Sequence, residues 1–250
     1  MKERKNVLGF RLFIFGFFFA FFQIMPALLP RFLTLSLTWG DLLDFLTPFA
    51  VIPLAYVLYS RALRSLNSLP DQESLARTPA TLAKIFLAIG AILYIDGHGL
   101  HLSANSISRL LQGMKGSELY KANYLFDEVI SHFMWDSGIF LISIGLVLLA
   151  SKISLNSLNL KSAVFVSLGA AFYGFTYTVN GIEGQTVIFT FPAAGVGFLL
   201  AIILYLKRQK KSPNPFLLFF IAGYFLSLVL FAYWGISRSG FPEFSELGWI

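Results

Sequence analysis

Histidine occurs at only three positions of the 250-residue chain, and all three lie in two short stretches that also carry carboxylates. The first stretch reads YIDGHGLHLSAN and the second reads DEVISHFMWD. The histidines are His98, His101 and His132. Zinc and iron take imidazole nitrogens and carboxylate oxygens as ligands, and carboxylates also orient metal-bound imidazoles. The two stretches therefore predict a metal site with these three histidines as ligands, and we expect zinc rather than iron.

A hairpin of two antiparallel helices would bring the stretches to the same depth. Residues three, four or seven positions apart share a helix face. The shared faces are His98, His101 and Asn105 on the first helix, and Glu128, His132 and Asp136 on the second. With the turn near residues 116–117, His101 is level with His132, Asn105 with Glu128, and His98 with Asp136. We therefore expect the two polar faces to meet inside the protein.

Carboxylates near the histidines supply the remaining groups that hydrolysis needs. We predict Glu128 or Glu183 as the general base and Asp136 as an orienting partner of the histidines. Glu183 lies between Gly181 and Gly184, at the end of an apolar run. A role as base or fourth ligand and a role as a solvated loop acid are both compatible with that position.

Three other acids have weaker claims to the site. Asp41 and Asp44 follow Thr38 at the start of an apolar run, where acids stabilise a helix N-terminus, so we expect capping. Asp44 is the better functional candidate of the two. Asp96 points away from His101 on an ideal helix and joins the site only if the flanking glycines distort that helix.

A metal with an open coordination position activates water and polarises a carbonyl. The sequence therefore favours a membrane-embedded metal-dependent hydrolase, and a substrate that arrives through the bilayer would be a lipid or a lipid-linked molecule. Two other classes remain open. One is a cation- or proton-coupled transporter that uses the same cluster, and the other is a redox protein with haem or non-haem iron. A further interpretation is that the histidines only form hydrogen bonds between helices and have a purely structural role.

Composition restricts the class of protein more firmly than these motifs do. Hydrophobic residue types make up 56% of the chain and charged types only 13%, whereas soluble domains carry about 25% charged residues. This excludes a water-soluble globule, a disordered chain and a nucleic-acid binder, although the net charge is +6. Cysteine is absent, which excludes disulfides and thiolate metal sites.

Seven apolar runs are long enough to cross a bilayer core, which takes about 20 residues per helix. They are residues 8–29, 41–60, 82–108, 123–150, 161–182, 187–206 and 215–236. The first run is long for a signal peptide and no small-residue cleavage site follows it, so we expect a retained span. The sequence thus predicts an all-α bundle of seven transmembrane helices, forming a single membrane domain over residues 1–250.

Charge distribution predicts the orientation of this bundle. If the N-terminus is cytoplasmic, 14 of the 19 Lys and Arg residues fall on the cytoplasmic side, as the positive-inside rule requires. The C-terminus is then extracytoplasmic. Ten of the 13 acidic residues fall in the outer half, which suggests an outward-facing pocket for cations, a metal or protons. In a bacterium we expect such a protein in the plasma membrane.

Overall fold

The computed structural model describes residues 4–67, 73–152, 158–208 and 213–249. Within these ranges the chain is helical and forms no strand, apart from one isolated bridge between Phe32 and Thr38. Among the described residues, seven helices are long and apolar enough to cross a membrane. The predicted all-α class and the predicted number of spans are therefore confirmed. Which side of a membrane each terminus faces stays a prediction.

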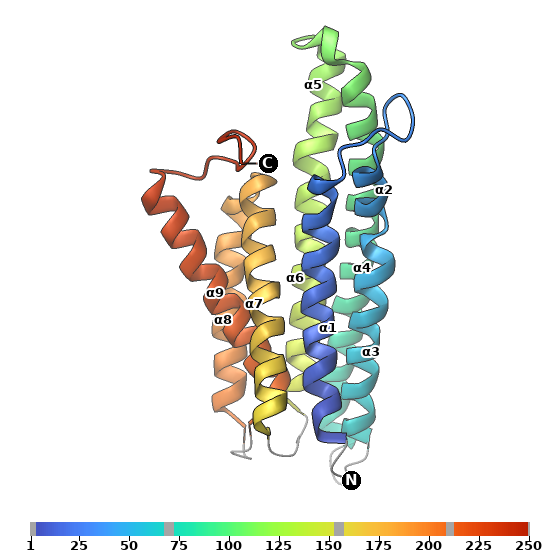
Figure 1. The fold of residues 1–250 in the computed structure, drawn as a ribbon. Coiled ribbons are helices and arrows are strands. Elements are labelled where there is room, and N and C mark those ends of the chain that lie inside the picture. Colours follow the sequence, from blue (N-terminus) through green and yellow to red (C-terminus); the bar gives the residue numbers. More distant parts are fainter. Residues whose placement is uncertain (1–3, 68–72, 153–157, 209–212, 250) are drawn as a thin grey trace.

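The helices stand side by side in one bundle (Figure 1). In chain order they are α1 (Arg4–Ile24), η1 (Met25–Leu28), α2 (Trp39–Phe45), α3 (Thr47–Asn67), α4 (Glu73–Leu110), η2 (Gln112–Met114), α5 (Glu118–Tyr124), η3 (Leu125–Ile130), α6 (Ser131–Ala150), α7 (Leu160–Glu183), α8 (Val187–Leu206) and α9 (Pro215–Ser237). Helix α4 packs most extensively against α6, and α1 packs against α7. Helices α8 and α9 lie beside α7, on the side of the bundle away from α3 and α4, and the top of α9 leans outward.

The predicted antiparallel hairpin is the pair formed by α4 and α6. The two backbones touch at Gly90 and Gly138, where a Cβ added to either glycine would lie 2.7 Å from the carbonyl oxygen of the other. Small residues permit this close approach between membrane helices. Helix α4 has 38 residues and therefore extends about 57 Å at 1.5 Å per residue, which is longer than a bilayer core of about 30 Å. Its upper end and α5 project beyond the rest of the bundle (Figure 1).

A π-helical turn interrupts the second helix of this hairpin. Residues Leu125–Ile130 form η3, between α5 and α6. A π-turn inserts one residue into the helical repeat, and such turns occur frequently at functional sites. Here Asp127 is buried, with 2% of its surface exposed, and it faces α4. An ideal α-helical wheel cannot predict this placement.

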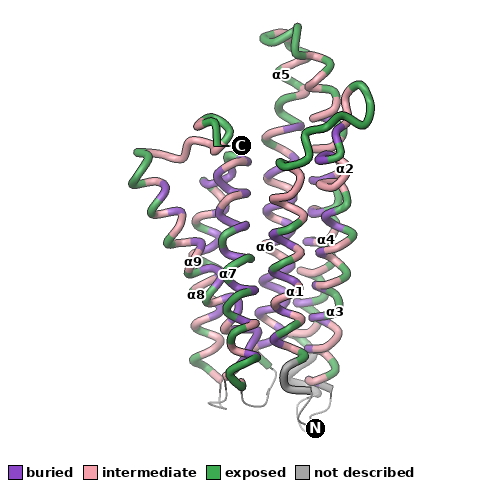
Figure 2. The backbone as a smooth tube through the Cα atoms, in the orientation of Figure 1, coloured by how far each residue is buried: buried purple, intermediate pink, exposed green. Residues whose placement is uncertain are grey.

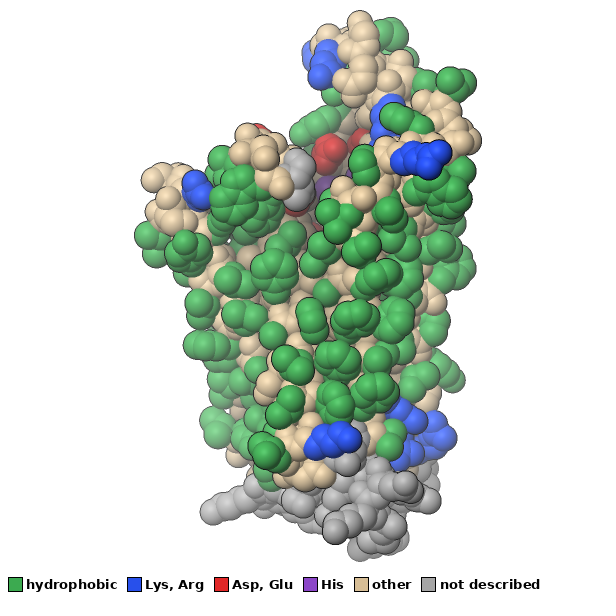
Figure 3. Space-filling model, in the orientation of Figure 1, with side chains coloured by type: hydrophobic (Ala, Val, Ile, Leu, Met, Phe, Trp, Pro, Cys, Tyr) green, Lys and Arg blue, Asp and Glu red, His purple; other side chains and the backbone are tan. Residues whose placement is uncertain are grey.

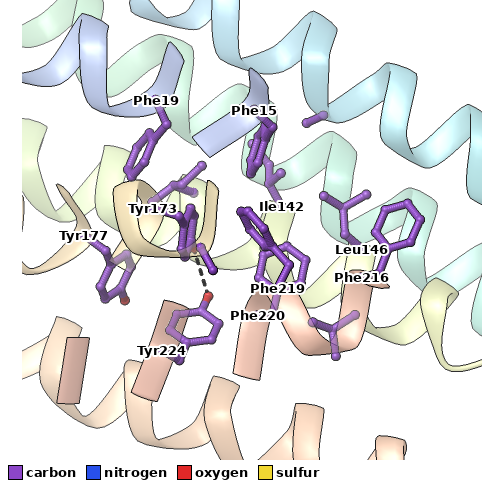
Figure 4. Close-up of a cluster of buried hydrophobic side chains, with 14 of the residues drawn as sticks. Phe15, Phe19, Ile142, Leu146, Tyr173, Tyr177, Phe216, Phe219, Phe220 and Tyr224 are labelled. Carbon is purple, nitrogen blue, oxygen red and sulfur yellow. Dashed lines mark hydrogen bonds between the residues drawn. The ribbon is translucent and has the colours of Figure 1, made fainter. Parts of the chain in front are cut away.

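Buried aromatic side chains fill the centre of the bundle. Phe15 and Phe19 of α1 pack around Tyr173 of α7 and Phe219 of α9 (Figure 4). The Tyr173 hydroxyl donates a hydrogen bond to the Tyr224 hydroxyl at 3.1 Å. Buried residues alternate with exposed ones along the helices and gather where the helices meet (Figure 2), and apolar side chains cover much of the outer surface in view (Figure 3). This exterior is compatible with contact to lipid, and it suggests an integral multi-pass membrane protein.

Candidate functional site

A cavity of about 1050 Å³ opens at the end of the bundle opposite the N-terminus. Its lining comes from α1, η1, α2, α4, η3, α6, α7, α9 and the segment that follows α9, and it combines polar with apolar side chains. The polar lining residues are Gln23, Thr38, Asp41, Asp44, His101, Asn105, Arg109, Glu128, His132, Thr178, Asn180, Glu183, Glu243 and Ser245. Acidic and histidine side chains are visible in the hollow near the top of Figure 3.

His101 is oriented by the carboxylate of Asp127, which the sequence pattern did not assign to the site. Its Nδ1 lies 3.1 Å from Oδ1 of Asp127, and Ser108 donates a hydrogen bond to Asp127 Oδ2 at 2.8 Å. Because Nδ1 faces Asp127, the Nε2 atom of His101 is left for a ligand in the cavity. This is the carboxylate–imidazole pairing that orients metal-bound or proton-transferring histidines.

His132 lies beside His101, with 5.1 Å between the ring centroids. Its ring stacks on the indole of Trp135 at 4.3 Å and an interplanar angle of 23°. Both of its ring nitrogens are buried and have no hydrogen-bond partner, and its Nε2 lies 3.8 Å from Glu128 Oε2. Gly184 packs directly against the ring, since a Cβ there would collide with Nδ1. An unpaired buried polar group costs about 1–3 kcal/mol, so a ligand that binds these nitrogens would remove that cost.

His98 occupies a different environment, fully buried and outside the lining of the cavity. Its Nδ1 lies 2.8 Å from the carbonyl oxygen of Tyr94, and Gln23 Nε2 lies 3.1 Å from its Nε2. Its ring is 4.7 Å from that of Trp135, while His101 is 5.2 Å from the same indole. The three histidines thus surround Trp135, but only two of them face the cavity.

The two other predicted catalytic acids already have partners. Asp136 accepts a hydrogen bond from the Thr186 hydroxyl at 2.5 Å and does not line the cavity. Glu183 does line it, but its Oε2 accepts the backbone N–H groups of Phe244 and Ser245, at 2.8 and 3.3 Å. Glu183 therefore anchors the segment after α9 to the end of α7.

That segment covers one side of the cavity. Gln185 donates a hydrogen bond to the Glu243 carboxylate, and Trp234 Nε1 donates to the carbonyl oxygen of Pro242 at 3.0 Å. Burial raises the pKa of the Glu243 carboxyl above its usual value. The nearby carboxylates of Glu183 and Glu246 raise it further, while the hydrogen bonds from Ser245 and Gln185 oppose the shift. Nothing in the sequence pattern predicted that this segment would contact the site.

The acids at the start of the second span behave as two distinct groups. Asp41 forms the predicted cap, a reciprocal pair of hydrogen bonds with Thr38, and it also pairs with Arg109 through both carboxylate oxygens. Asp44 lines the cavity, and its Oδ1 lies 3.8 Å from His98 Nε2. Asp96 is exposed and outside the cavity lining, and α4 continues without a break through its flanking glycines.

Two of the residue pairs that the hairpin was expected to place at equal depth have other partners in the structure. Asn105 donates to Asp41 Oδ1 at 3.0 Å rather than meeting Glu128, and His98 and Asp136 each bind elsewhere. Only His101 and His132 come together as expected. Among the residues that the structure describes, no group of three or more His, Asp or Glu side chains is placed to hold one metal ion.

Comparisons with protein-family models, with curated proteins and with solved structures return no match to this chain. The proposals that follow therefore rest on the geometry of the cavity and on the chemistry of its lining residues.

Proposed function

We propose that this protein is a membrane-embedded, metal-dependent hydrolase that acts on a lipid or lipid-linked substrate. The observation that carries the proposal is the pair of imidazoles, His101 and His132, in the lining of a large cavity that also carries apolar side chains such as Phe175 and Leu230. Metal-ion chemistry fits the imidazoles, and an acyl or isoprenoid chain fits the apolar part of the lining.

The donor set suits a divalent metal, with zinc ahead of iron. His101 has its Nδ1 at Asp127 and its Nε2 free, and His132 has two buried nitrogens without partners. Glu128 supplies a carboxylate 3.8 Å from His132 Nε2. Nitrogen and carboxylate ligands with an oriented imidazole are typical of catalytic zinc sites. Small movements of Glu128 and the two rings would complete a three-ligand set, and His98 would join it only if the Gln23 side chain turned away.

The bound metal would supply an activated water and a Lewis acid for a carbonyl or phosphoryl oxygen. Asp127 holds His101 in one orientation, and Trp135 fixes the plane of His132 by stacking. Asp136 and Glu183 act in this proposal as positioning residues, because their carboxylates already bind Thr186 and the backbone after α9.

The shape of the opening supports a substrate that enters from the bilayer. Phe175 of α7 and Tyr233 of α9 line the cavity and are nevertheless 46% and 65% exposed. An exposed apolar side chain at the rim of a cavity in a membrane helix lets a lipid chain pass without contacting water. With the N-terminus cytoplasmic, as the charge distribution predicts, this opening lies in the extracytoplasmic half of the membrane.

A transporter that uses the same acids is the second candidate. The excess of carboxylates in the cavity lining favours it, because they would attract cations. Every lining residue, however, comes from one end of the bundle, and the buried aromatic side chains around Tyr173 (Figure 4) are not part of the lining. The cavity therefore has the form of a dead-ended site rather than of a path across the membrane, which favours the hydrolase.

Elemental analysis of detergent-purified protein tests the proposal. We expect about one zinc or iron per chain, and loss of most of it in His101→Ala and His132→Ala. Glu118→Gln is the matched control, because that side chain is 90% exposed and far from the cavity lining. A purified, folded wild-type chain without stoichiometric divalent metal contradicts the metal assignment. Cation flux in liposomes without bound metal would support the transporter instead.

A further inference from the structure

The cavity lining carries carboxylates that the protein itself does not neutralise. Five acidic residues line it against one guanidinium, that of Arg109. Both terminal nitrogens of Arg109 bind the Asp41 carboxylate, and Nη1 also donates to the carbonyl oxygen of Ser36 at 2.7 Å. The single fixed cation of the lining is therefore already bound. The acids left over are Asp44, Glu128, Glu183 and Glu243.

Asp44 is the least satisfied of these acids. Its side chain is 13% exposed, and its Oδ2 atom is buried without a hydrogen-bond partner. Its nearest basic group is His98, 3.8 Å away, whose Nδ1 and Nε2 already contact the Tyr94 carbonyl and the Gln23 amide. A poorly solvated carboxylate without a partner is unfavourable and is stabilised when a cation approaches.

A second observation points to a ligand in the same cavity. The His132 side chain is 7% exposed and lines the cavity, and neither of its ring nitrogens has a partner. Two unsatisfied polar groups from different helices, α2 and α6, thus face one space of about 1050 Å³. The same lining also carries apolar side chains such as Phe175 and Leu230, so a ligand that fills this space is expected to have both a polar and an apolar part.

The aromatic pair Trp234 and Trp249 in the lining already holds a cation from the chain itself. The Arg238 guanidinium lies 5.2 Å from the ring centroid of Trp234 and 5.1 Å from that of Trp249. Asp44, by contrast, has no Lys or Arg partner among the described residues and keeps one carboxylate oxygen without a hydrogen bond.

We infer that the ligand of this cavity is an amphiphile with a positively charged ammonium headgroup that lies against Asp44. The inference rests on the proposed function and narrows its substrate class from any lipid to a cationic one. At this position a phosphate or diphosphate headgroup would meet the Asp44 carboxylate, with which no Lys or Arg of the described lining is paired, and like charges repel strongly in a site of low dielectric constant.

Tryptophan fluorescence offers a direct binding assay, because Trp135, Trp234 and Trp249 line the cavity. Purified protein in maltoside micelles is titrated with an alkyltrimethylammonium, an alkyl phosphate and an alkyl maltoside of equal chain length. We expect the ammonium compound to bind at least tenfold more tightly than the phosphate. Asp44→Asn should remove most of that preference, and Asp96→Asn, an exposed acid outside the cavity lining, should leave it unchanged.

Equal or tighter binding of the phosphate overturns the inference, and so does an unchanged preference in Asp44→Asn. The titration is repeated after treatment with EDTA to separate this inference from the proposed metal site. An ammonium preference that appears only after chelation means that the headgroup occupies the metal position, which also overturns the inference. If a protein without metal or hydrolytic activity still shows the preference, the inference stands while the proposed function falls.

Discussion

Replacing Asp127 by asparagine tests how the site holds His101. The Asp127 carboxylate is buried, contacts His101 Nδ1 at 3.1 Å and accepts a hydrogen bond from Ser108. Asparagine keeps the shape of this side chain and can still accept the Ser108 hydrogen bond, but it carries no charge. The substitution therefore weakens the orientation and basicity of His101 without opening a cavity.

The expected size of the effect follows from the contacts that are lost. Removing a partner that orients a metal-bound histidine typically lowers metal affinity by about 10–100-fold, which corresponds to about 1.4–2.7 kcal/mol. A hydrogen bond to a charged group contributes about 1.5–3 kcal/mol to folding. We therefore expect Asp127→Asn to fold, with reduced thermal stability, and to bind zinc about 10–100-fold more weakly.

Competition with a chromophoric chelator measures this affinity on metal-stripped protein in detergent. Ser108→Ala is the matched control: it removes one hydrogen bond to Asp127 but keeps the carboxylate beside His101, so its zinc affinity should fall by less than about tenfold, the lower end of the range for loss of the orienting partner itself. If Asp127→Asn is folded and binds zinc as tightly as the wild type, Asp127 does not orient a metal ligand and the reasoning is refuted.

Three further predictions concern packing and the segment after α9. Gly138→Ala places a methyl group 2.7 Å from the α4 backbone and should lower the free energy of unfolding by about 1–3 kcal/mol. Gly99→Ala meets nothing within 4 Å and should raise the free energy of unfolding by about 0.5–1 kcal/mol. Thermal unfolding in detergent compares the two variants. Gly184→Ala pushes a methyl group against His132, so metal content should fall while the unfolding temperature changes little, and retained metal would contradict the proposed role of His132. The raised pKa of Glu243 means that protonation favours the docked segment, so docking should strengthen as the pH falls from the raised pKa toward the ordinary value of a glutamate. Hydrogen exchange of residues 241–249 measures docking, and Glu243→Gln should abolish its pH dependence.

The sequence predicted the helices well because the relevant signals are local. A transmembrane helix satisfies its backbone hydrogen bonds within its own segment, so length and hydropathy suffice to find it. The Thr38–Asp41 cap was predictable for the same reason, since its two residues are three positions apart. The pairing of His101 with His132 followed from one further assumption, an antiparallel hairpin with a short turn.

Contacts that depend on helix packing or on an irregular turn could not be predicted from these local signals. The π-turn at Leu125–Ile130 shifts the helical repeat, and it places Asp127 on the side facing His101, where an ideal wheel places Glu128.

By itself, then, the sequence determined that this chain forms apolar helices and where its few ionisable groups lie along them, because both follow from residue type and local periodicity. Only the tertiary structure decided which carboxylate orients which histidine, that Arg109 is bound by Asp41 across 68 positions of sequence, and that the segment after α9 returns to cover the cavity. These contacts join residues far apart in the chain. They depend on how closely two backbones approach at positions such as Gly90 and Gly138, a property of the packed bundle and not of any one segment.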